Sequence, residues 1–186
     1  MTNGPFEIDV DTLGNLRPIS KVVFSLGSNM GEPEEILRDS VQFLADTPDL
    51  ILVDVSPVYQ TKPVGEVEQD DFLNLIVIAE STMEPLTILD RVHAIEEHFG
   101  RERVIVGGPR TLDIDLIVVG RHGSQPGLDL PHPRAHERAF VLVPWLDVEP
   151  NAELGDFGPI GDLAEDLDLS GVVRRDDIVI EMPGRS

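Results

Sequence analysis

Strand-like apolar runs and amphipathic helical patterns follow one another along this chain in an order that few folds accommodate. Runs rich in Val, Ile, Leu and Phe predict strands over 21–27, 50–58, 72–79 and 112–119. Apolar residues at helical spacing predict one helix from Gly31-Glu32-Pro33 to about Ala45 and a second from about Pro85 to Phe99. The expected order is therefore strand, helix, strand, strand, helix, strand.

That order is the ferredoxin-like plan (βαββαβ), so we predict an α+β fold with an antiparallel sheet and both helices packed on one face. Residues 1–20 are polar and broken by Gly and Pro, and we expect an N-terminal extension or linker remnant there, before a single domain over 21–186. Loops are expected at 59–71 and 100–110. The expected C-terminal extension comprises a Pro/His-rich loop at 126–138, an apolar segment at 139–146, a short helix near 161–169 and a last strand near 177–182.

The composition excludes several classes of function. The chain has no cysteine, which rules out disulfides and thiolate metal sites. Its net charge of −21 argues against nucleic-acid and anionic-membrane partners, which are bound by clustered Lys and Arg. No apolar run approaches the roughly 18–20 residues that span a bilayer, and no secretory signal pattern opens the sequence. We therefore expect a cytoplasmic monomer that acts on small molecules.

The arginines gather where an anion site could be built. Residues 101–138 contain six arginines against five acids, whereas the rest of the chain is strongly acidic. Arg101, Arg103 and Arg110 bracket a glycine-containing loop, which suits phosphate neutralisation and closure over a substrate. Surface arginines that balance an acidic protein are the alternative interpretation. No G-x-x-x-x-G-K-[ST] pattern occurs in the chain.

The Asp113 and Asp115 pair follows this loop directly. Side chains two apart on a strand point to one face, and we expect this face to continue with Ile117 and Val119. A solvated sheet face would explain a bare D-x-D pattern, but this face turns apolar after Asp115. Two adjacent carboxylates repel each other unless a cation lies between them, and hard oxygen ligands favour Mg²⁺.

Two further groups of residues could bind ligands. His132, Arg134, His136 and Arg138 lie in a Pro-bounded loop, whose composition favours phosphate hydrogen bonding over a zinc site. Phe72, Asn74 and Thr61 could instead recognise a heterocycle, through a ring to stack on and through the amide's donors and acceptor. Singly, each of these three residue types is more often structural than ligand-binding.

Together these segments resemble the 6-hydroxymethyl-7,8-dihydropterin pyrophosphokinase family. The resemblance rests on the following segments: Ser25-Leu26-Gly27-Ser28-Asn29, Tyr59-Gln60-Thr61, Phe72-Leu73-Asn74, Gly108-Pro109-Arg110-Thr111-Leu112-Asp113-Ile114-Asp115, Leu130-Pro131-His132-Pro133 and Arg138-Ala139-Phe140. It covers about residues 21–146, and the G-P-R-x-x-D-x-D element followed by P-H is the most specific part.

The resemblance implies an ATP-dependent diphosphotransferase of folate biosynthesis, which moves the β,γ-pyrophosphoryl group of ATP to the pterin hydroxymethyl group and releases AMP. It implies that Asp113 and Asp115 bind two Mg²⁺ ions and act in catalysis with Arg101 and Arg110. ATP and its phosphates would be bound by Arg103, Arg110, Leu116, His132, Arg138 and Glu96. The pterin would be bound by Thr61, Val64, Phe72, Asn74 and Phe140, with the two rings on either side of it.

Three positions depart from the family's pattern. Val106-Gly107 replaces an Arg-Trp pair, Lys62 stands where proline is common, and Pro133 stands where a tyrosine can occur. These departures leave open a catalytically weak homologue that binds pterin and nucleotide. A ferredoxin-like interaction module is the third hypothesis, because that fold also serves RNA-binding and regulatory domains.

Overall fold

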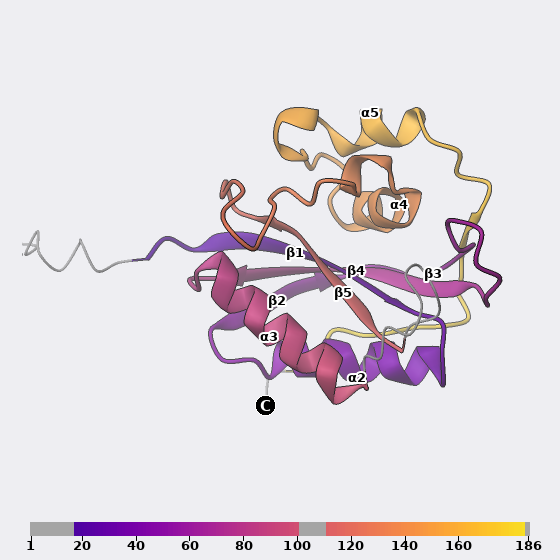
Figure 1. Cartoon of the computed structure of the whole chain (residues 1–186), viewed down its shortest axis with the longest axis horizontal. Coiled ribbons are helices and arrows are strands. Elements are labelled where there is room, and N and C mark those ends of the chain that lie inside the picture. Colours follow the sequence, from indigo (N-terminus) through magenta and orange to yellow (C-terminus); the bar gives the residue numbers. More distant parts are fainter. Residues whose placement is uncertain (1–16, 101–110, 185–186) are drawn as a thin grey trace, which may run out of the picture.

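A six-stranded antiparallel sheet runs through the middle of the molecule, with helices on both of its faces (Figure 1). The structure is a computed structural model and describes residues 17–100 and 111–184. The strand order is β5-β1-β4-β3-β6, and β2 pairs with β4 as well. The strands are β1 (Ser20–Ser28), β2 (Leu50–Val55), β3 (Tyr59–Thr61), β4 (Phe72–Ser81), β5 (Asp113–Val119) and β6 (Val172–Arg174). The antiparallel sheet confirms the predicted fold class.

Two helices cover one face of this sheet, as predicted. Helix α2 (Pro33–Ala45) and helix α3 (Pro85–His98) each begin with a proline, which suits the first turn because its missing N–H is not needed there. Their apolar sides, including Leu37, Val41, Ile88 and Val92, pack on the sheet in one buried cluster.

The C-terminal extension covers the opposite face. The apolar segment predicted at 139–146 is helix α4 (Ala139–Val148), and helix α5 (Ile160–Glu165) packs beside it (Figure 1). The short 3-10 turns η1 (Ala135–Glu137) and η2 (Gly155–Phe157) flank α4. Trp145 is fully buried in this second cluster. The sheet therefore lies between two helical layers. The prediction of helices on one face is right for α2 and α3, and the layer of α4 and α5 on the other face was not predicted.

Strand β4 pairs with two strands along one edge, which corrects two predictions. Residues 50–58 do not form one strand: β2 ends at Val55, the backbone N–H of Ser56 then donates to the carbonyl of Ile76, and the Ile76 N–H donates to Ser56 Oγ. The segment 59–61, predicted as the start of a loop, is β3, because Tyr59 and Thr61 pair with β4 opposite Asn74 and Phe72. The loop begins at residue 62.

The prediction of a last strand near 177–182 was also wrong. No strand occupies 177–182; β6 lies earlier and pairs with β3. Ile178 and Ile180 instead lie in extended chain and are buried in the cluster beneath α2 and α3. Their alternation resembles a strand, but it arises because an extended segment presents every second side chain to one surface. The described helices include none that is long and apolar enough to cross a membrane.

Candidate active site

Asn74 and Asp113 lie in one row across three adjacent strands. Gly27 in β1 pairs with Asn74 of β4 on one side and with Asp113 of β5 on the other. Residues directly opposite each other point to the same face, and two strand spacings amount to about 10 Å between the outer backbones. The sheet thus places the predicted pterin residue and the predicted metal residue on one face, with a glycine between them.

Strand β5 keeps the two aspartates on the α4 side of the sheet, but its alternation does not continue to Val119. Asp115 and Ile117 share that face with Asp113, and Ile117 is buried near Trp145. A register shift then occurs: Val23 faces Val118 and Phe24 faces Leu116, so Ile117 is an extra residue on β5. Val119 therefore joins the cluster on the α2 and α3 side. The predicted face was wrong at that residue.

A cavity of about 870 Å³ opens above this row. It lies between the sheet, the loop that follows β3, the start of α4 and the segment that leads into β6. Nine of the site residues predicted from the sequence line it: Thr61, Val64, Phe72, Asn74, Asp113, Asp115, His132, Arg138 and Phe140. The fold thus brings residues more than 70 positions apart in the sequence into one cavity.

Asp115 is held between two basic side chains. Arg138 Nη1 donates to Asp115 Oδ2 at 3.0 Å, and His132 Nε2 lies 3.9 Å from Asp115 Oδ1. Side chains 115 and 138 are each only 24% exposed, so solvent screens this pair less than a surface pair. The Arg138 guanidinium also lies over the Phe140 ring, 5.5 Å from its centroid. These contacts show that Asp115 is not a freely solvated carboxylate.

The ring of His132 has a defined orientation. Its Nδ1 accepts a hydrogen bond from the Arg134 backbone N–H at 3.2 Å, so in the neutral ring the proton resides on Nε2. Burial lowers the pKa of His132 below its ordinary 6.5. The neighbouring arginines at 138 and 134 lower this pKa further, and the aspartates oppose them. His132 is therefore a neutral donor whose Nε2–H faces the aspartate side of the cavity.

Asn74 and Thr61 form a buried polar pair at the other end. Asn74 Nδ2 donates to Thr61 Oγ1 at 2.5 Å, and the two residues are 4% and 3% exposed. This bond turns Asn74 Oδ1 towards Gly27, which also lines the cavity. The pair thus presents an acceptor oxygen and a hydroxyl donor, a combination that fits the edge of a nitrogen heterocycle.

Two predicted residues lie behind the cavity wall instead of in it. Glu96 on α3 is 1% exposed, and its Oε2 accepts a hydrogen bond from the Ile114 backbone N–H at 3.2 Å. This contact fixes the β5 backbone between the two aspartates. The Leu116 side chain is buried in the cluster on the α2 and α3 side. Arg101, Arg103, Arg110 and the pair Val106-Gly107 lie outside the described residues.

One wall of the cavity was not predicted from the sequence. Asp168, Ser170, Gly171 and Val172 line it, and the backbone N–H of Lys62 donates to the carbonyl of Gly171 at 3.1 Å. This contact joins segments 109 positions apart, so no local pattern could reveal it. Ser25, Gly27, Gln69 and Glu137 also line the cavity without an assigned role, and Arg134 of the predicted phosphate-binding loop lines it as well.

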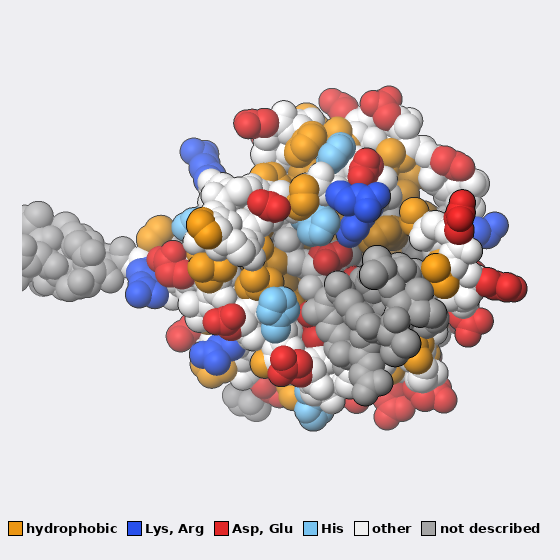
Figure 2. All heavy atoms as spheres, in the orientation of Figure 1, with side chains coloured by type: hydrophobic (Ala, Val, Ile, Leu, Met, Phe, Trp, Pro, Cys, Tyr) orange, Lys and Arg blue, Asp and Glu red, His pale blue; other side chains and the backbone are white. Residues whose placement is uncertain are grey.

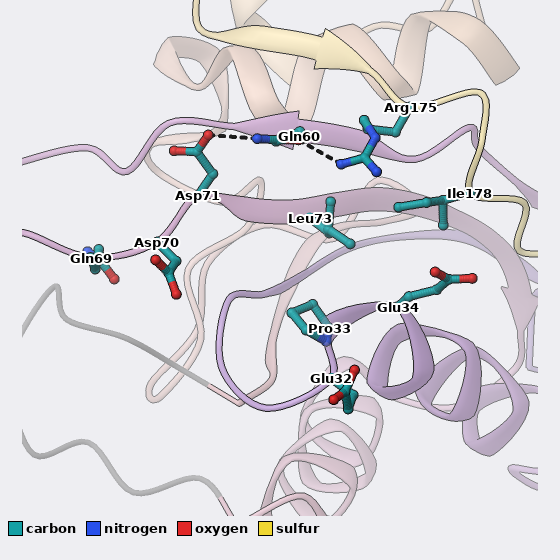
Figure 3. A pocket seen from close by; sticks show the side chains of 10 residues that line it. All are labelled: Glu32, Pro33, Glu34, Gln60, Gln69, Asp70, Asp71, Leu73, Arg175 and Ile178. Carbon is teal, nitrogen blue, oxygen red and sulfur yellow. Dashed lines mark hydrogen bonds between the residues drawn. The ribbon is translucent and has the colours of Figure 1, made fainter.

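A second cavity of about 590 Å³ shares Gln69 with the first (Figure 3). Its charged lining consists of Glu32, Glu34, Asp70, Asp71 and Arg175, and Gln60 bridges Asp71 and Arg175 at 2.8 and 2.7 Å. The negative charge of these four carboxylates disfavours binding of a polyphosphate in the smaller cavity.

The charged side chains are unevenly distributed on the face shown in Figure 2. Acidic side chains are scattered widely over it, whereas a Lys or Arg group lies beside histidines near its middle. The larger cavity is therefore the candidate active site.

Comparisons with known proteins point to one family. The family model for 7,8-dihydro-6-hydroxymethylpterin-pyrophosphokinase (HPPK) matches residues 23–150. A 2-amino-4-hydroxy-6-hydroxymethyldihydropteridine pyrophosphokinase of Pseudomonas aeruginosa is 36% identical over 157 residues, which cover 84% of this chain and 97% of that protein. A protein of the same name from Mycobacterium leprae is 45% identical over 148 residues, covering 73% and 75%.

Solved structures of HPPK-DHPS proteins share the fold of this chain. An HPPK-DHPS crystal structure in complex with substrates superimposes with a TM-score of 0.62 at 13% identity, and the match covers 80% of this chain. A Plasmodium falciparum HPPK-DHPS triple mutant gives 0.64 at 15% identity, over 82% of this chain. The matched region is 43% and 45% of those longer chains.

Proposed function

This chain belongs to the 7,8-dihydro-6-hydroxymethylpterin-pyrophosphokinase family, and we propose that the cavity of about 870 Å³ is its active site. The enzyme transfers the pyrophosphoryl group of ATP to 6-hydroxymethyl-7,8-dihydropterin in folate biosynthesis. The hydroxymethyl oxygen forms a bond to the β-phosphorus, the bond from that phosphorus to the α–β bridging oxygen breaks, and AMP leaves. The hydroxyl proton passes to solvent.

The pterin binds at the Asn74 end in this proposal. Asn74 Oδ1 accepts from the amino and ring N–H groups of the heterocycle, and the Thr61 hydroxyl donates to it. Phe72 and Phe140 supply the apolar faces for the ring, and Val64 borders the opening. A buried polar pair of this kind rejects ligands that leave it without hydrogen bonds, which gives selectivity for the pterin edge.

Asp113 and Asp115 fit magnesium. Both carboxylates project into the cavity from one strand face, and all their ligand atoms are hard oxygens. Residues 17–100 and 111–184 contain no cluster of three or more Asp, Glu, His or Cys side chains that could hold a metal ion. Mg²⁺ commonly completes its shell with water and substrate phosphate oxygens, so a pair suffices. Two bound Mg²⁺ ions would neutralise charge on the transferring phosphates.

The basic side chains orient the phosphate chain. Arg138 touches both the aspartate and the Phe140 ring, so it links the phosphate end of the cavity to the pterin end. His132, as a neutral Nε2–H donor, adds a hydrogen bond to a phosphate oxygen without adding charge. Phosphoryl transfer needs such positioning and charge neutralisation more than covalent chemistry from the protein.

The observation that carries this proposal is the row of Asn74, Gly27 and Asp113 across three strands. It holds a heterocycle-binding group about 10 Å from a carboxylate pair, which is roughly the reach from a pterin ring to the phosphates attached to its hydroxymethyl group. The test is incubation with ATP, Mg²⁺ and the hydroxymethyl pterin, with AMP and pterin diphosphate as products. Tight binding of both substrates without either product would favour the non-catalytic homologue instead.

A further inference from the structure

The 3-10 turn η1 is bordered by an arginine for which the reaction described above has no role. Arg134 and Glu137 both line the active-site cavity, beside His132 and Arg138. We propose that Arg134 is a further phosphate-binding residue, whose guanidinium exchanges Glu137 for the phosphate chain of ATP. This inference rests on the proposed function, because it adds a cation to the same site.

The ion pair between Arg134 and Glu137 costs little free energy to break. Arg134 Nε donates to Glu137 Oε1 at 2.9 Å, and the two side chains are 63% and 49% exposed. Exposed pairs of this kind contribute little to stability, because water solvates both charges when they separate. Arg138, in contrast, is bound to a partly buried aspartate, so its charge is already engaged. Arg134 is thus the arginine of the described cavity lining that a ligand displaces at least cost.

The electrostatics of the cavity favour an additional cation beside Arg138. The chain carries a net charge of −21, and the cavity lining includes Asp113, Asp115, Glu137 and Asp168. A nucleoside triphosphate entering this field is repelled unless cations lie on its path. A guanidinium suits the purpose because it offers several N–H donors in a plane to adjacent phosphate oxygens.

The backbone of Arg134 places it next to the proposed phosphate contact. Its N–H donates to His132 Nδ1, which leaves the Nε2–H of that ring for a ligand. One turn therefore presents two donors, an imidazole and a guanidinium, to the same cavity. When phosphate binds Arg134, Glu137 returns to solvent at the rim.

The test measures binding of α,β-methylene-ATP with Mg²⁺ by calorimetry, so that no turnover is required. We expect Arg134→Ala to raise the dissociation constant about tenfold, the effect of one charge-assisted hydrogen bond lost to water. Arg134→Lys should restore part of the affinity. Arg38→Ala is the matched control, because Arg38 pairs with Glu34 at 2.8 Å on the surface and lines neither cavity. The control should change affinity less than about twofold.

A second variant separates a ligand contact from a structural pair. Glu137→Gln frees Arg134, so ATP affinity should stay the same or increase. An equal loss of ATP affinity in Glu137→Gln and Arg134→Ala would overturn the proposal, because the pair itself would then be what matters. Unchanged ATP affinity in Arg134→Ala would overturn it as well. If wild type forms no product while Arg134→Ala still weakens ATP binding, the proposed reaction fails and the assignment of Arg134 stands.

Discussion

A Cβ atom on residue 27 would lie 2.6 Å from Oδ1 of Asn74, well inside contact distance. Gly27 therefore leaves room for an amide that must reach into the active-site cavity. Asn74 has no freedom to move aside, because it is buried and bound to Thr61. The glycine is needed for space, since its φ lies outside the left-handed region that favours glycine.

Gly27→Ala should weaken pterin binding by at least about tenfold, because the displaced amide loses its hydrogen bonds to the heterocycle. ATP affinity should stay within about twofold, since the aspartates are not displaced. Fluorescence titration of the pterin measures the effect. Gly123→Ala is the matched control, because a Cβ there meets nothing within 4 Å. Equal pterin affinity in Gly27→Ala and wild type would show that Asn74 does not bind the ring.

Asp113→Asn should lower kcat about a thousandfold or more, since metal-assisted charge neutralisation contributes several kcal/mol. Asp115→Asn should lose activity similarly but also some stability, because it removes the charge partner of Arg138. Steady-state kinetics and calorimetry measure both effects. Near-wild-type activity in either variant would rule out the metal assignment. Asp39→Asn, at an exposed position of α2, serves as control.

We expect the free energy of unfolding to fall at high pH because Tyr59 ionises there. Burial and the hydrogen bond to Asp147 raise the pKa of Tyr59 from 10.0 to about 12. Because the folded-state pKa is the higher one, the stabilisation is complete below pH 10 and is lost between pH 10 and about 12. Tyr59→Phe should remove this pH dependence in denaturant titrations.

The same pKa can be measured directly. Tyr59 is the only tyrosine of the chain, so tyrosinate absorbance reports it alone. A midpoint near pH 10 in the folded protein would contradict the structural environment of this residue.

Asn29 should control the loop between β3 and β4. Its Nδ2 donates to Gln69 Oε1 and to the Asp70 carbonyl, both at 2.9 Å, and the residue is 5% exposed. Asn29→Ala should cost about 1–3 kcal/mol of unfolding free energy. It should also raise KM for the pterin more than KM for ATP, since this loop carries Val64 and leads into Phe72. Gln42→Ala is the control, because it removes an exposed bond to Asp46 and should change stability by less than about 0.5 kcal/mol.

Local signals in the sequence predicted the elements that local chemistry determines. Proline at the first turn and apolar spacing located α2 and α3, and continuous apolar runs located β1 and β4. The errors concern the ends of β2 and β5, together with β3 and β6, whose structure depends on partners distant in the sequence. Three residues at 59–61 form a strand only because β4 is beside them.

The residues of the candidate site also fall into two groups, those that local spacing predicts and those that depend on long-range contacts. Asp113 and Asp115 share a face because they lie two apart on one strand, so their spacing alone predicted the pair. The wall at Asp168–Val172 depends on a contact with Lys62, and the role of Gly27 depends on the register of three strands. Nothing in the local sequence encodes either relationship.

The extra residue at Ile117 matters for anyone who redesigns strand β5. A binary pattern of polar and apolar residues extended from Asp113 would assign position 119 to the cavity face, where a hydrophilic substitution looks harmless. Val119 is in fact completely buried on the opposite face. A sequence generated from simple alternation would therefore place a polar group in the closed interior beneath α2 and α3, so libraries for this strand should change their phase after Leu116.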